Sequence, residues 1–373
     1  MVGEGGNDMD KMFLKISIIT VCYNSEKNIE QTIRSVLKQG YKNKEYIIID
    51  GGSNDNTKEI IGRYQDKLAY WCSEPDQGLY DAMNKGIQHS TGDVIAFLNS
   101  DDWYENDVLD KVNEYFLETK ADMISGRINA VINDRIFLGQ TLPGPVEDIR
   151  IGMIYPHQAL FAKAVIFKNI GGFNLRYKIA ADYDWILRAY VKGANILRVK
   201  DTFTNCRDGG ISSNAYECGI EHRTIALSYL CEYTKEIDRK KIENYYEDKV
   251  NEGLVMLVCQ EVLKKNAKSI GLQIGNENGY YIWGTGRRGE KCYNMLKKME
   301  LKINGFIDNS RTFDVLHGYK VLMPEEVGEE GIICISTSQY EKEIIKQMQE
   351  MRISKERYIS FYEIQRIVAK LGL

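Results

Sequence analysis

The sequence predicts an α/β protein whose main sheet is mostly parallel and doubly wound. Near-continuous apolar runs, typical of strands buried on both faces, alternate with segments of helical periodicity. Small and polar residues directly follow the first of these runs. The chain has 373 residues, which is more than one compact core usually holds, so we expect two domains.

Four strands alternating with three helices are expected in the N-terminal part. The strands cover residues 16–22, 46–49, 68–72 and 93–98. The first helix carries Ile29, Ile33 and Val36 at helical spacing, and the third helix covers residues 78–89. In such parallel sheets the ligand-binding ends of the strands share one edge.

The alternation changes after Asp102. A hairpin is expected within 121–138, a short strand at 157–161, a helix that stops at Gly171 and another over 183–190. Residues 215–270 contain no proline and are rich in Glu, Lys, Leu and Tyr, which predicts a helical connector. The expected division is a disordered tail at 1–12, a first domain at 13–214, the connector at 215–270 and a second α/β domain at 271–373.

Composition excludes several classes of protein. The net charge of -4 provides no global basic field, so no nucleic-acid partner is expected. No apolar run reaches the roughly 20 residues of a membrane-spanning helix, and the N-terminal segment does not resemble a secretion signal. The 8 cysteines include no Cys-x-x-Cys pair, so we expect reduced thiols in a cytoplasmic protein.

Two adjacent carboxylates follow the strand at 93–98. Asp101 and Asp102 stand at its C-terminal end, where α/β proteins bind ligands. Carboxylate oxygens there are hard ligands for Mg²⁺ or Mn²⁺, which in turn bind substrate phosphates. The alternative is a polar loop whose aspartates cap the next helix.

Small and polar residues also follow the first two strands. Thr20, Tyr23 and Asn24 stand between a buried strand and a helix, a natural place for the ring and phosphates of a nucleotide. Asp50 can accept a hydrogen bond from a base or ribose, and Gly51 lets the backbone approach closely. Simple turns with helix caps are the alternative at both places.

Four motifs occur in order along the chain: SIITVCYN, YIIIDGGSNDNT, EPDQGLYDAMNKGI and GDVIAFLNSDDWY. Together they resemble the inverting family 2 glycosyltransferases with the GT-A fold, in particular the cytoplasmic type that builds bacterial surface polysaccharides. The resemblance covers residues 13–214. It implies a Rossmann-like sheet, a nucleotide-sugar donor and a divalent metal ion.

The resemblance also implies roles for single residues. The nucleotide of the donor would be held by Thr20, Tyr23, Asn24, Asp50 and Gly51, and by Tyr80, Asp81, Asn84 and Lys85 on the helix after the third strand. Asp102 would bind the metal ion, and Asp101 the ribose or the metal shell. Gly51 replaces a second Asp of many relatives, and Asn99 replaces the first acid of Asp-x-Asp, so the nucleobase and the strength of metal binding stay open.

Inversion needs one general base, placed across the sugar from the departing diphosphate. The family carries an acidic motif before a helix that ends in Leu-Arg. Asp182 stands at this position, ahead of Leu187 and Arg188, so the resemblance gives Asp182 the role of the base, with Asp184 as the runner-up. From the residues alone, both acids are also explained as favourable charges at a helix N-terminus.

Two further residues are candidates for the site. His157 would border the donor and acceptor sites and contact a phosphate or the metal shell; the alternative is a buried structural histidine. Arg207 opens a glycine loop at 207–212. This loop would close over the diphosphate with Arg207 as a charge clamp, or simply link helices.

The C-terminal part has its own glycine motif. Gly284, Gly286 and Gly289 form Gly-x-Gly-x-x-Gly directly after an expected strand at 280–283, and Asp308 follows near the place of a ribose-binding acid. This short unit resembles the Rossmann-like modules appended to sugar-processing proteins. Partner binding or a structural role, nucleotide binding, and redox chemistry with NAD are its alternatives.

The sequence thus predicts a metal-dependent inverting glycosyltransferase of the hexosyl or N-acetylhexosaminyl class, acting on a glycan or lipid-linked hydroxyl. One alternative is a non-catalytic nucleotide-sugar-binding protein. Another is a bifunctional or regulatory protein whose C-terminal unit binds a nucleotide or dinucleotide. Peripheral contact with the inner face of a membrane and a homo-oligomer formed through the helical or C-terminal region are further expectations.

Overall fold

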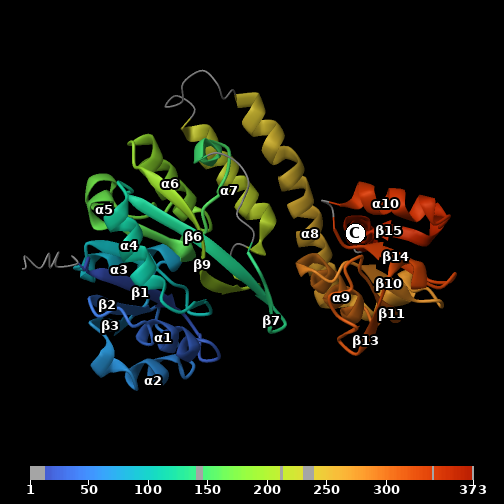
Figure 1. Cartoon of the computed structure of the whole chain (residues 1–373), viewed down its shortest axis with the longest axis horizontal. Coiled ribbons are helices and arrows are strands. Elements are labelled where there is room, and N and C mark those ends of the chain that lie inside the picture. Colours follow the sequence, from blue (N-terminus) through green and yellow to red (C-terminus); the bar gives the residue numbers. More distant parts are fainter. Residues whose placement is uncertain (1–12, 140–145, 211–212, 230–238, 338–339, 372–373) are drawn as a thin grey trace, which may run out of the picture. The chain divides into compact units, whose positions relative to one another are not determined.

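The computed structural model of the chain describes residues 13–139, 146–210, 213–229, 239–337 and 340–371. The chain divides into two compact units, Met1–Ser213 with Glu221–Tyr245 and Asn214–Ile220 with Tyr246–Leu373 (Figure 1). The tail expected at 1–12 and the last two residues of the glycine loop 207–212 lie outside the described residues.

One mixed sheet forms the centre of the first unit. Its strand order is β3-β2-β1-β4-β8-β6-β9-β5, with β7 beside β6. The strands are β1 (Ile16–Cys22), β2 (Lys44–Asp50), β3 (Tyr70–Ser73), β4 (Val94–Phe97), β5 (Trp103–Tyr104), β6 (Met123–Ile132), β7 (Arg135–Phe137), β8 (Leu160–Lys163) and β9 (Ile196–Arg207). The helices before the second sheet are α1 (Ile29–Leu37), α2 (Thr57–Gly62), α3 (Leu79–His89), α4 (Val108–Glu118), α5 (Ala164–Ile170), α6 (Ala181–Val191), α7 (Ala215–Ser228) and α8 (Arg239–Ile274).

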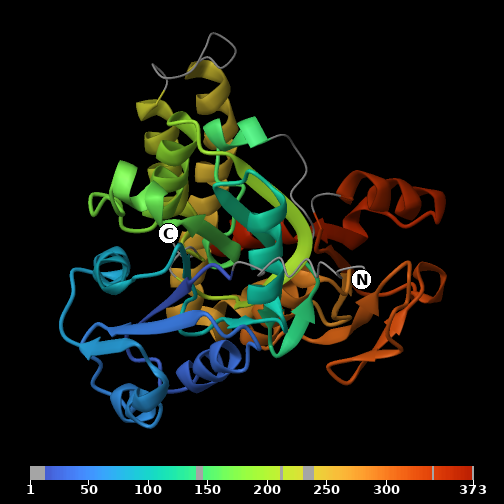
Figure 2. The same ribbon diagram turned by 60° about the vertical axis from the view of Figure 1, so that its left-hand side comes forward.

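The first four strands are parallel, and their order places the ends of three of them together. β1 pairs with β2 on one side and with β4 on the other, and Cys22 lies opposite Asp50 at the end of the first ladder. Figure 2 shows the blue strands of this region side by side. The turns that follow β1, β2 and β4 therefore share one edge of the sheet, as the sequence predicts.

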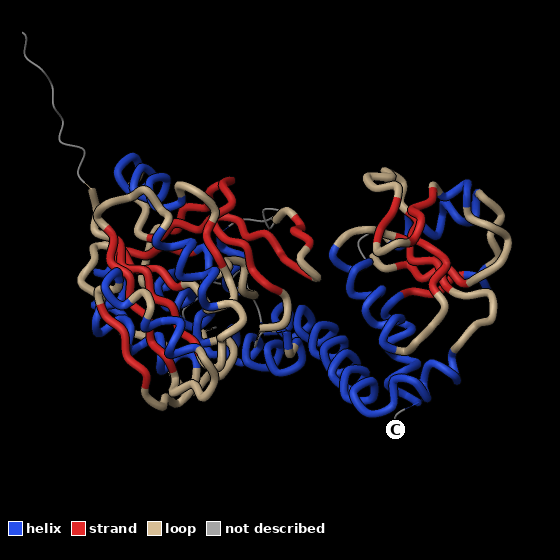
Figure 3. Tube along the Cα trace, turned by 90° about the horizontal axis from the view of Figure 1, so that it is seen from below, coloured by secondary structure: helices blue, strands red, loops and turns tan. Residues whose placement is uncertain are grey.

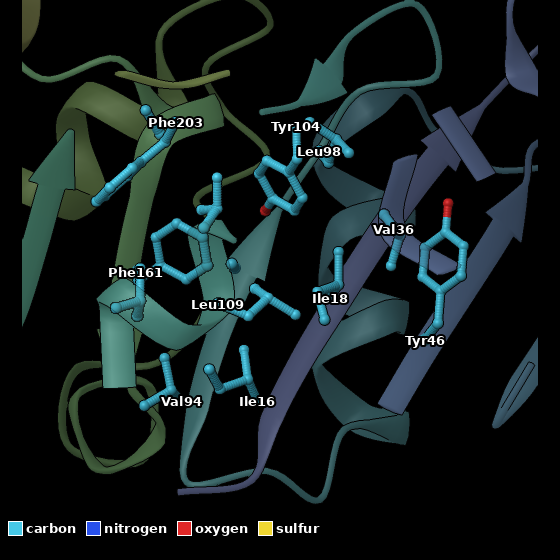
Figure 4. Packing of buried hydrophobic residues seen from close by; sticks show 14 of the residues in the cluster. Ile16, Ile18, Val36, Tyr46, Val94, Leu98, Tyr104, Leu109, Phe161 and Phe203 are labelled. Atoms are coloured by element: carbon cyan, nitrogen blue, oxygen red, sulfur yellow. The ribbon is translucent and has the colours of Figure 1, made fainter. Parts of the chain in front are cut away.

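Helices cover both faces of this sheet because its strands are apolar on both faces. Ile18 of β1 belongs to the same buried cluster as Val36 of α1 and Leu109 of α4 (Figure 4). On the other face, Gly86 brings α3 so close to Ile19 that a Cβ at Gly86 would lie 2.3 Å from the Ile19 side chain. The α/β class is confirmed, with the predicted strands and helices of the N-terminal part close to their expected positions.

Two elements differ from their expected form. The strand expected at 157–161 begins only at Leu160, and His157–Ala159 forms a 3₁₀ turn before it. β9 was not expected, because its polar and charged residues mask the strand pattern. It pairs with β6 over most of its length and brings Arg207 to the edge of the sheet that follows β4.

A second sheet of order β12-β13-β11-β10-β14-β15 forms the second unit. Its strands are β10 (Tyr280–Trp283), β11 (Ile303–Ile307), β12 (Val315–Leu316), β13 (Tyr319–Leu322), β14 (Ile332–Ile335) and β15 (Tyr358–Ser360), and its helices are α9 (Arg287–Lys298), α10 (Glu341–Glu350) and α11 (Phe361–Leu371). Apart from the β12–β13 hairpin the pairs are parallel. Figure 3 shows these strands with helices around them.

The glycine motif of the second unit forms a tight turn between β10 and α9. Gly284 has a φ of 112°, and a Cβ at Gly289 would lie 2.0 Å from the Gly284 carbonyl oxygen, so both positions require glycine. The carboxylate of Asp308, which the sequence placed near a ribose, accepts hydrogen bonds from Thr285 and Ser310. This acid therefore stabilises the turn itself.

Within the described residues, none of the helices combines the length and the hydropathy that crossing a membrane requires.

Glu45 on β2 makes the stability of the first unit depend on acid pH. Its buried carboxylate pairs with Lys15 and accepts hydrogen bonds from Ser17 and Thr91. Burial raises the pKa of Glu45, but these partners outweigh burial and lower it to about 2. A lowered folded-state pKa stabilises above the unfolded value of 4.5 and is lost as the pH falls towards 2.

We therefore expect Glu45→Gln to lower the free energy of unfolding by about 1–3 kcal/mol at pH 6, and by clearly less at pH 3. Urea unfolding at the two pH values measures this difference. Glu59→Gln, at an exposed position on α2, is the control and should match the original protein at both. A Glu45→Gln deficit that is equal at both pH values would contradict the assignment.

Candidate active site

The turn after β4 is held in place by α1. The backbone N–H of Asp102 donates to the Asn99 carbonyl at 3.1 Å, which closes the turn. The Thr32 hydroxyl of α1 lies 2.9 Å from the Ser100 carbonyl and 2.7 Å from the Asp102 carbonyl. The adjacent carboxylates of Asp101 and Asp102 therefore sit on a fixed backbone at the predicted edge of the sheet.

Water solvates these two carboxylates poorly, because Asp102 is buried and Asp101 is partly buried. The Asp102 side chain is almost completely enclosed, with 2% of its residue surface exposed. Burial, followed by the charge of Asp101, raises the pKa of Asp102 to about 7, although the Arg207 backbone N–H donates to its Oδ1 at 3.1 Å. Burial also raises the pKa of Asp101. A positive charge bound next to Asp101 and Asp102, in addition to the charge of Arg207, would stabilise both ionised carboxylates.

The donor set fits a divalent cation that shares its ligands with a substrate. Asp101 and Asp102 supply hard oxygen ligands, which Mg²⁺ and Mn²⁺ prefer. Among the described residues, however, no group of three or more His, Cys, Asp or Glu side chains is arranged to hold a metal ion. The remaining ligands would have to be phosphate oxygens and water, which is the usual manner of Mg²⁺ binding.

A second cluster joins Asp182, His157 and Tyr80. Asp182 stands in the first turn of α6, and its Oδ2 lies 2.9 Å from Nδ1 of His157. Its Oδ1 accepts the hydroxyl of Tyr80 at 3.0 Å and the backbone N–H of Tyr183 at 2.9 Å. The other ring nitrogen of His157, Nε2, lies 3.5 Å from Oδ1 of Asn99. This contact connects the cluster to the turn that carries the paired carboxylates.

Hydrogen bonding keeps Asp182 ionised inside the protein. Burial raises its pKa, but the hydrogen bond and charge of His157, together with Tyr80, outweigh burial and lower it. Burial and the charge of Asp182 raise the pKa of Tyr80, so its hydroxyl stays protonated and donates. The cluster is thus a buried carboxylate with a tyrosine on one side and a histidine on the other.

Aromatic side chains enclose this cluster from behind. A small cavity is bounded by His157, Asp182 and apolar side chains that include Phe97, Phe173 and Trp185. Phe97 and Phe173 meet edge to face with their ring centroids 5.2 Å apart. Because this wall is apolar, the electrostatic interaction between Asp182 and His157 is stronger than it would be in water.

The turns after β1 and β2 bring together only some of the predicted nucleotide ligands. Tyr23 is 60% exposed beside Asn24, whose φ of 51° turns the chain sharply. Thr20, by contrast, is buried against the Tyr46 hydroxyl, 3.0 Å away. Asp50 is also buried, and its oxygens accept hydrogen bonds from Ser53 in the turn that follows and from the Ser73 hydroxyl at the end of β3. Thr20 and Asp50 therefore stabilise this edge of the sheet through buried hydrogen bonds.

Gly51 has an unexpected neighbour. A Cβ at Gly51 would lie 2.5 Å from Oδ2 of Asp76, so the Asp76 carboxylate occupies the space over this glycine. The backbone N–H of Gly78 donates to the other oxygen of Asp76 at 2.8 Å and fixes its direction. The Asp76 carboxylate is therefore a further acidic group at the edge of the sheet where the resemblance to the family leads one to expect an acid. Asp76 lies within the motif EPDQGLYDAMNKGI, but the spacing of this motif does not predict the contact between Asp76 and Gly51.

The helix residues expected to line the nucleotide pocket divide into two groups. Tyr80 belongs to the Asp182 cluster, and Asn84 exchanges two hydrogen bonds with the backbone of Phe173. Asp81 accepts the Gln77 N–H, and Lys85 pairs with Glu74 at 2.9 Å. Asp81 and Lys85 therefore hold the loop that carries Asp76, whereas Tyr80 and Asn84 face the region of α5 and α6.

Arg207 reaches the acidic turn from β9. Its guanidinium donates to Oε1 of Gln31 at 2.7 Å and stacks over the Trp103 ring, 4.9 Å from the centroid. Its charge also acts on Asp101. The backbone of Arg207 thus contacts Asp102, and its guanidinium also lies 3.5 Å from Oδ1 of Asp134. Arg207 is the last residue of a strand and not part of a loop between helices, and its role as a clamp stays a prediction.

A capping carboxylate that the sequence did not reveal completes the start of α6. Oε1 of Glu221 accepts the N–H of Lys178 at 2.8 Å, and Oε2 accepts those of Ile179 and Ala180, both at 2.9 Å. The Ile179 carbonyl in turn accepts the Tyr80 hydroxyl at 2.6 Å. Glu221 therefore fixes the segment that positions Asp182.

We expect Glu221→Gln to lower the free energy of unfolding by roughly 1–3 kcal/mol, because an amide cannot accept all three donors. Turnover should fall as well, since the start of α6 loses its fixed place. Urea unfolding and a turnover assay measure the two effects. Glu118→Gln, at an exposed position on α4, is the control. Stability unchanged within about 0.5 kcal/mol would contradict this role.

A mostly parallel α/β sheet that carries paired carboxylates at the end of β4 is the architecture of a GT-A-type glycosyltransferase. The family model described as Glycosyl transferase family 2 matches residues 17–179. An uncharacterized glycosyltransferase of Mycobacterium tuberculosis is 37% identical over 181 residues, which cover 47% of this chain and 68% of the relative. The chain belongs to glycosyl transferase family 2.

Further similarities are to a second glycosyltransferase, to a solved structure with a related fold and, in the second unit, to another family model. A PGL/p-HBAD biosynthesis glycosyltransferase of Mycobacterium bovis is 29% identical over 197 residues, covering 49% of this chain and 72% of that protein. The crystal structure of S. aureus TarS 1-349 in complex with UDP-GlcNAc superimposes with a TM-score of 0.50 at 19% identity, over 77% of this chain and 80% of that chain. A model described as C2185-like, N-terminal, matches residues 277–359 in the second unit.

Proposed function

We propose that the chain transfers a sugar, with inversion, from a nucleotide-sugar donor to a hydroxyl group. One observation carries this proposal: the adjacent carboxylates of Asp101 and buried Asp102 lie near the ion pair of His157 with buried Asp182, and the contact between Asn99 and His157 links the two groups. The first pair suits a departing diphosphate, and the second suits an incoming hydroxyl. A non-catalytic sugar-nucleotide-binding protein would need only the first.

The donor would lie across the turns after β1, β2 and β4. Tyr23 offers an exposed ring to a nucleobase, and Asp76 offers a carboxylate beside Gly51. Asp101 and Asp102 would hold Mg²⁺ or Mn²⁺, and this ion, when bound, neutralises charge that develops on the diphosphate. Arg207 lies beside the same carboxylates and would contribute a fixed positive charge.

Removal of the hydroxyl proton would depend on Asp182, the residue to which the family resemblance gives the role of the base. Its hydrogen bonds to Tyr80 and Tyr183 hold the carboxylate in one orientation. A single base and a single displacement give inversion at the anomeric carbon, because the hydroxyl attacks the face opposite the leaving diphosphate.

The relatives suggest where to look for substrates. TarS was solved with UDP-GlcNAc, so UDP-sugars of the hexosyl and N-acetylhexosaminyl classes are the first donors to test. The M. bovis relative is named for PGL/p-HBAD biosynthesis, which supports a glycan or lipid-linked acceptor. Peripheral membrane contact and self-association stay predictions.

The test is a screen of the full-length chain against UDP-, GDP- and dTDP-sugars with Mg²⁺ or Mn²⁺, in which release of the nucleoside diphosphate is measured with water as the acceptor. At least one donor should be consumed, and excess EDTA should suppress this turnover. Binding of a donor without any consumption would favour the non-catalytic alternative. Consumption unaffected by EDTA would remove the metal from the proposal.

A further inference from the structure

The guanidinium of Arg127 on β6 has no partner within the described part of the chain. Its Nε atom is enclosed by the protein and forms no hydrogen bond, and no described carboxylate forms an ion pair with it. A buried donor of a charged group is costly to leave unpaired, so its presence calls for an explanation. The side chain as a whole is only half-buried, which leaves part of the guanidinium open to a ligand.

The register of three strands places Arg127 level with the turn after β4. Phe161 of β8 pairs with Ala96 of β4 on one side and with Ile124 of β6 on the other. Three residues further along these two strands stand Asn99 and Arg127. In the strand order, β6 lies beyond β8, on the side of β4 away from β1 and β2. Arg127 is therefore at the edge that carries the site, but away from the strands that would hold the nucleotide.

Arg127 points to the face of the sheet that carries Asp182. Ser125, two residues earlier on β6, pairs with Leu160. Leu160 lines the cavity that His157 and Asp182 also border. Side chains two residues apart on a strand share a face, and so do residues paired across two strands. Because the donor would lie over the turns after β1, β2 and β4, this face is where an acceptor would extend away from Asp182.

A second guanidinium lies on the same face. Arg198 of β9 pairs with Ser125, so the two side chains share a face. The guanidinium of Arg198 lies 5.9 Å from the centroid of the Tyr155 ring, in the segment that leads to His157. Two arginines therefore bring positive charge to the face on which the acceptor would lie.

Two acids on neighbouring segments have other partners. Asp201 stands next to the β9 residue that pairs with Arg127, but its carboxylate forms an ion pair with Lys111 of α4 at 2.7 Å. Oε1 of Glu105 accepts a hydrogen bond from Nδ2 of Asn205 at 2.8 Å. Neither carboxylate forms an ion pair with Arg127, whose charge is thus available to an anion from outside the protein.

We propose that Arg127, with Arg198 beside it, binds a phosphate group of the acceptor. This assignment rests on the proposed glycosyl transfer and names the class of its acceptor: a molecule that carries a phosphate as well as the hydroxyl that receives the sugar. A guanidinium pairs with a phosphate through two parallel N–H donors. Two guanidinium groups on one face suit the three acceptor oxygens and the higher charge of a phosphate ester better than the single charge of a carboxylate.

Geranyl phosphate, inorganic phosphate and geraniol are the probes for this site. Calorimetric titration of the full-length chain, with UDP and Mg²⁺ in excess to fill the donor site, measures their binding. Arg127→Gln should weaken the binding of both phosphates roughly 10–100-fold and leave any binding of geraniol unchanged. Arg127→Lys keeps the positive charge and should lose less affinity than Arg127→Gln. Tighter binding of geranyl phosphate than of inorganic phosphate would assign a lipid-linked source, and equal binding a phosphate without a lipid.

Arg63→Gln is the matched control, because Arg63 is an exposed arginine at the end of α2, 3.9 Å from Glu30. This variant should bind both phosphates as the original protein does. Thermal melting shows whether each variant is folded. Arg127→Lys serves as the folded comparison if Arg127→Gln is unstable.

Hydrolysis of the donor found in the panel screen shows where the phosphate binds. Geranyl phosphate should slow this hydrolysis without competing with the donor, because it occupies the acceptor side. Competition with the donor would place the phosphate at the paired carboxylates and overturn the assignment.

Three results of the titrations would also overturn the assignment. These are no phosphate binding at millimolar concentration, an unchanged affinity in Arg127→Gln, and tighter binding of the carboxylate analogue geranic acid than of geranyl phosphate. If the unaltered chain consumes no donor, the proposed function fails, whereas the titrations still decide whether Arg127 binds a phosphate.

Discussion

Replacing Asp182 with asparagine is expected to lower the rate of donor consumption by roughly 10²–10⁴-fold while the affinity for the nucleoside diphosphate stays the same. The Tyr183 N–H and the Tyr80 hydroxyl both donate to one oxygen of this side chain. The amide oxygen of asparagine would take that place and turn its NH₂ group towards His157. Asparagine has no basic oxygen to accept a proton, so it cannot serve as the general base.

Steady-state kinetics and calorimetry separate the two quantities in this experiment. Asp201→Asn provides the control, because Asp201 is a carboxylate on β9 that pairs with Lys111 at 2.7 Å. Its loss should leave turnover unchanged. Donor consumption by Asp182→Asn within tenfold of the original rate would show that neither direct proton removal nor positioning depends on this carboxylate.

The second large effect is expected at Asp102. Replacing it with asparagine should weaken binding of the nucleoside diphosphate at least about 10–100-fold in the presence of Mg²⁺ or Mn²⁺, which is the loss seen when even the outer partners of metal ligands are removed. Without the metal ion, the variant and the original chain should bind equally weakly. The fold should survive, because asparagine at this buried position removes a charge that lies beside Asp101.

Calorimetric titrations with the diphosphate, each run with excess metal ion and with excess EDTA, measure this dependence. Asp122→Asn is a suitable control, because Asp122 is a carboxylate that forms an ion pair with Lys163 at 3.5 Å. A full metal-stimulated affinity in Asp102→Asn would remove Asp102 from the metal site and leave Asp101 as the candidate.

Sequence patterns predict most of the N-terminal sheet for a simple physical reason. β1, β2 and β4 are buried on both faces, so nearly every residue in them is apolar and their ends are visible where polar residues begin. The edge of the sheet that carries the site follows from this alternation alone. β9 escapes prediction because one of its faces is partly exposed and carries charged residues.

Predicting the partners of single side chains requires contacts between distant segments. Tyr80 and Asn84 lie in a motif that indicated nucleotide binding, yet their partners are Asp182 and Phe173, about a hundred residues further along the chain. Asp76 over Gly51 is a similar case, since the two residues lie on different segments and meet only in the folded chain.

The position of Glu221 also affects the minimal length of chain that catalysis requires. The family match ends at residue 179, yet the three N–H groups just ahead of Asp182 take their acceptor from Glu221 of α7, which lies 41 to 43 residues beyond the donors. A protein shortened to residue 214 would keep the four family motifs of the N-terminal part and lose this acceptor. We expect such a protein to bind a donor and to turn it over slowly, so the minimal catalytic length exceeds the length that defines the family.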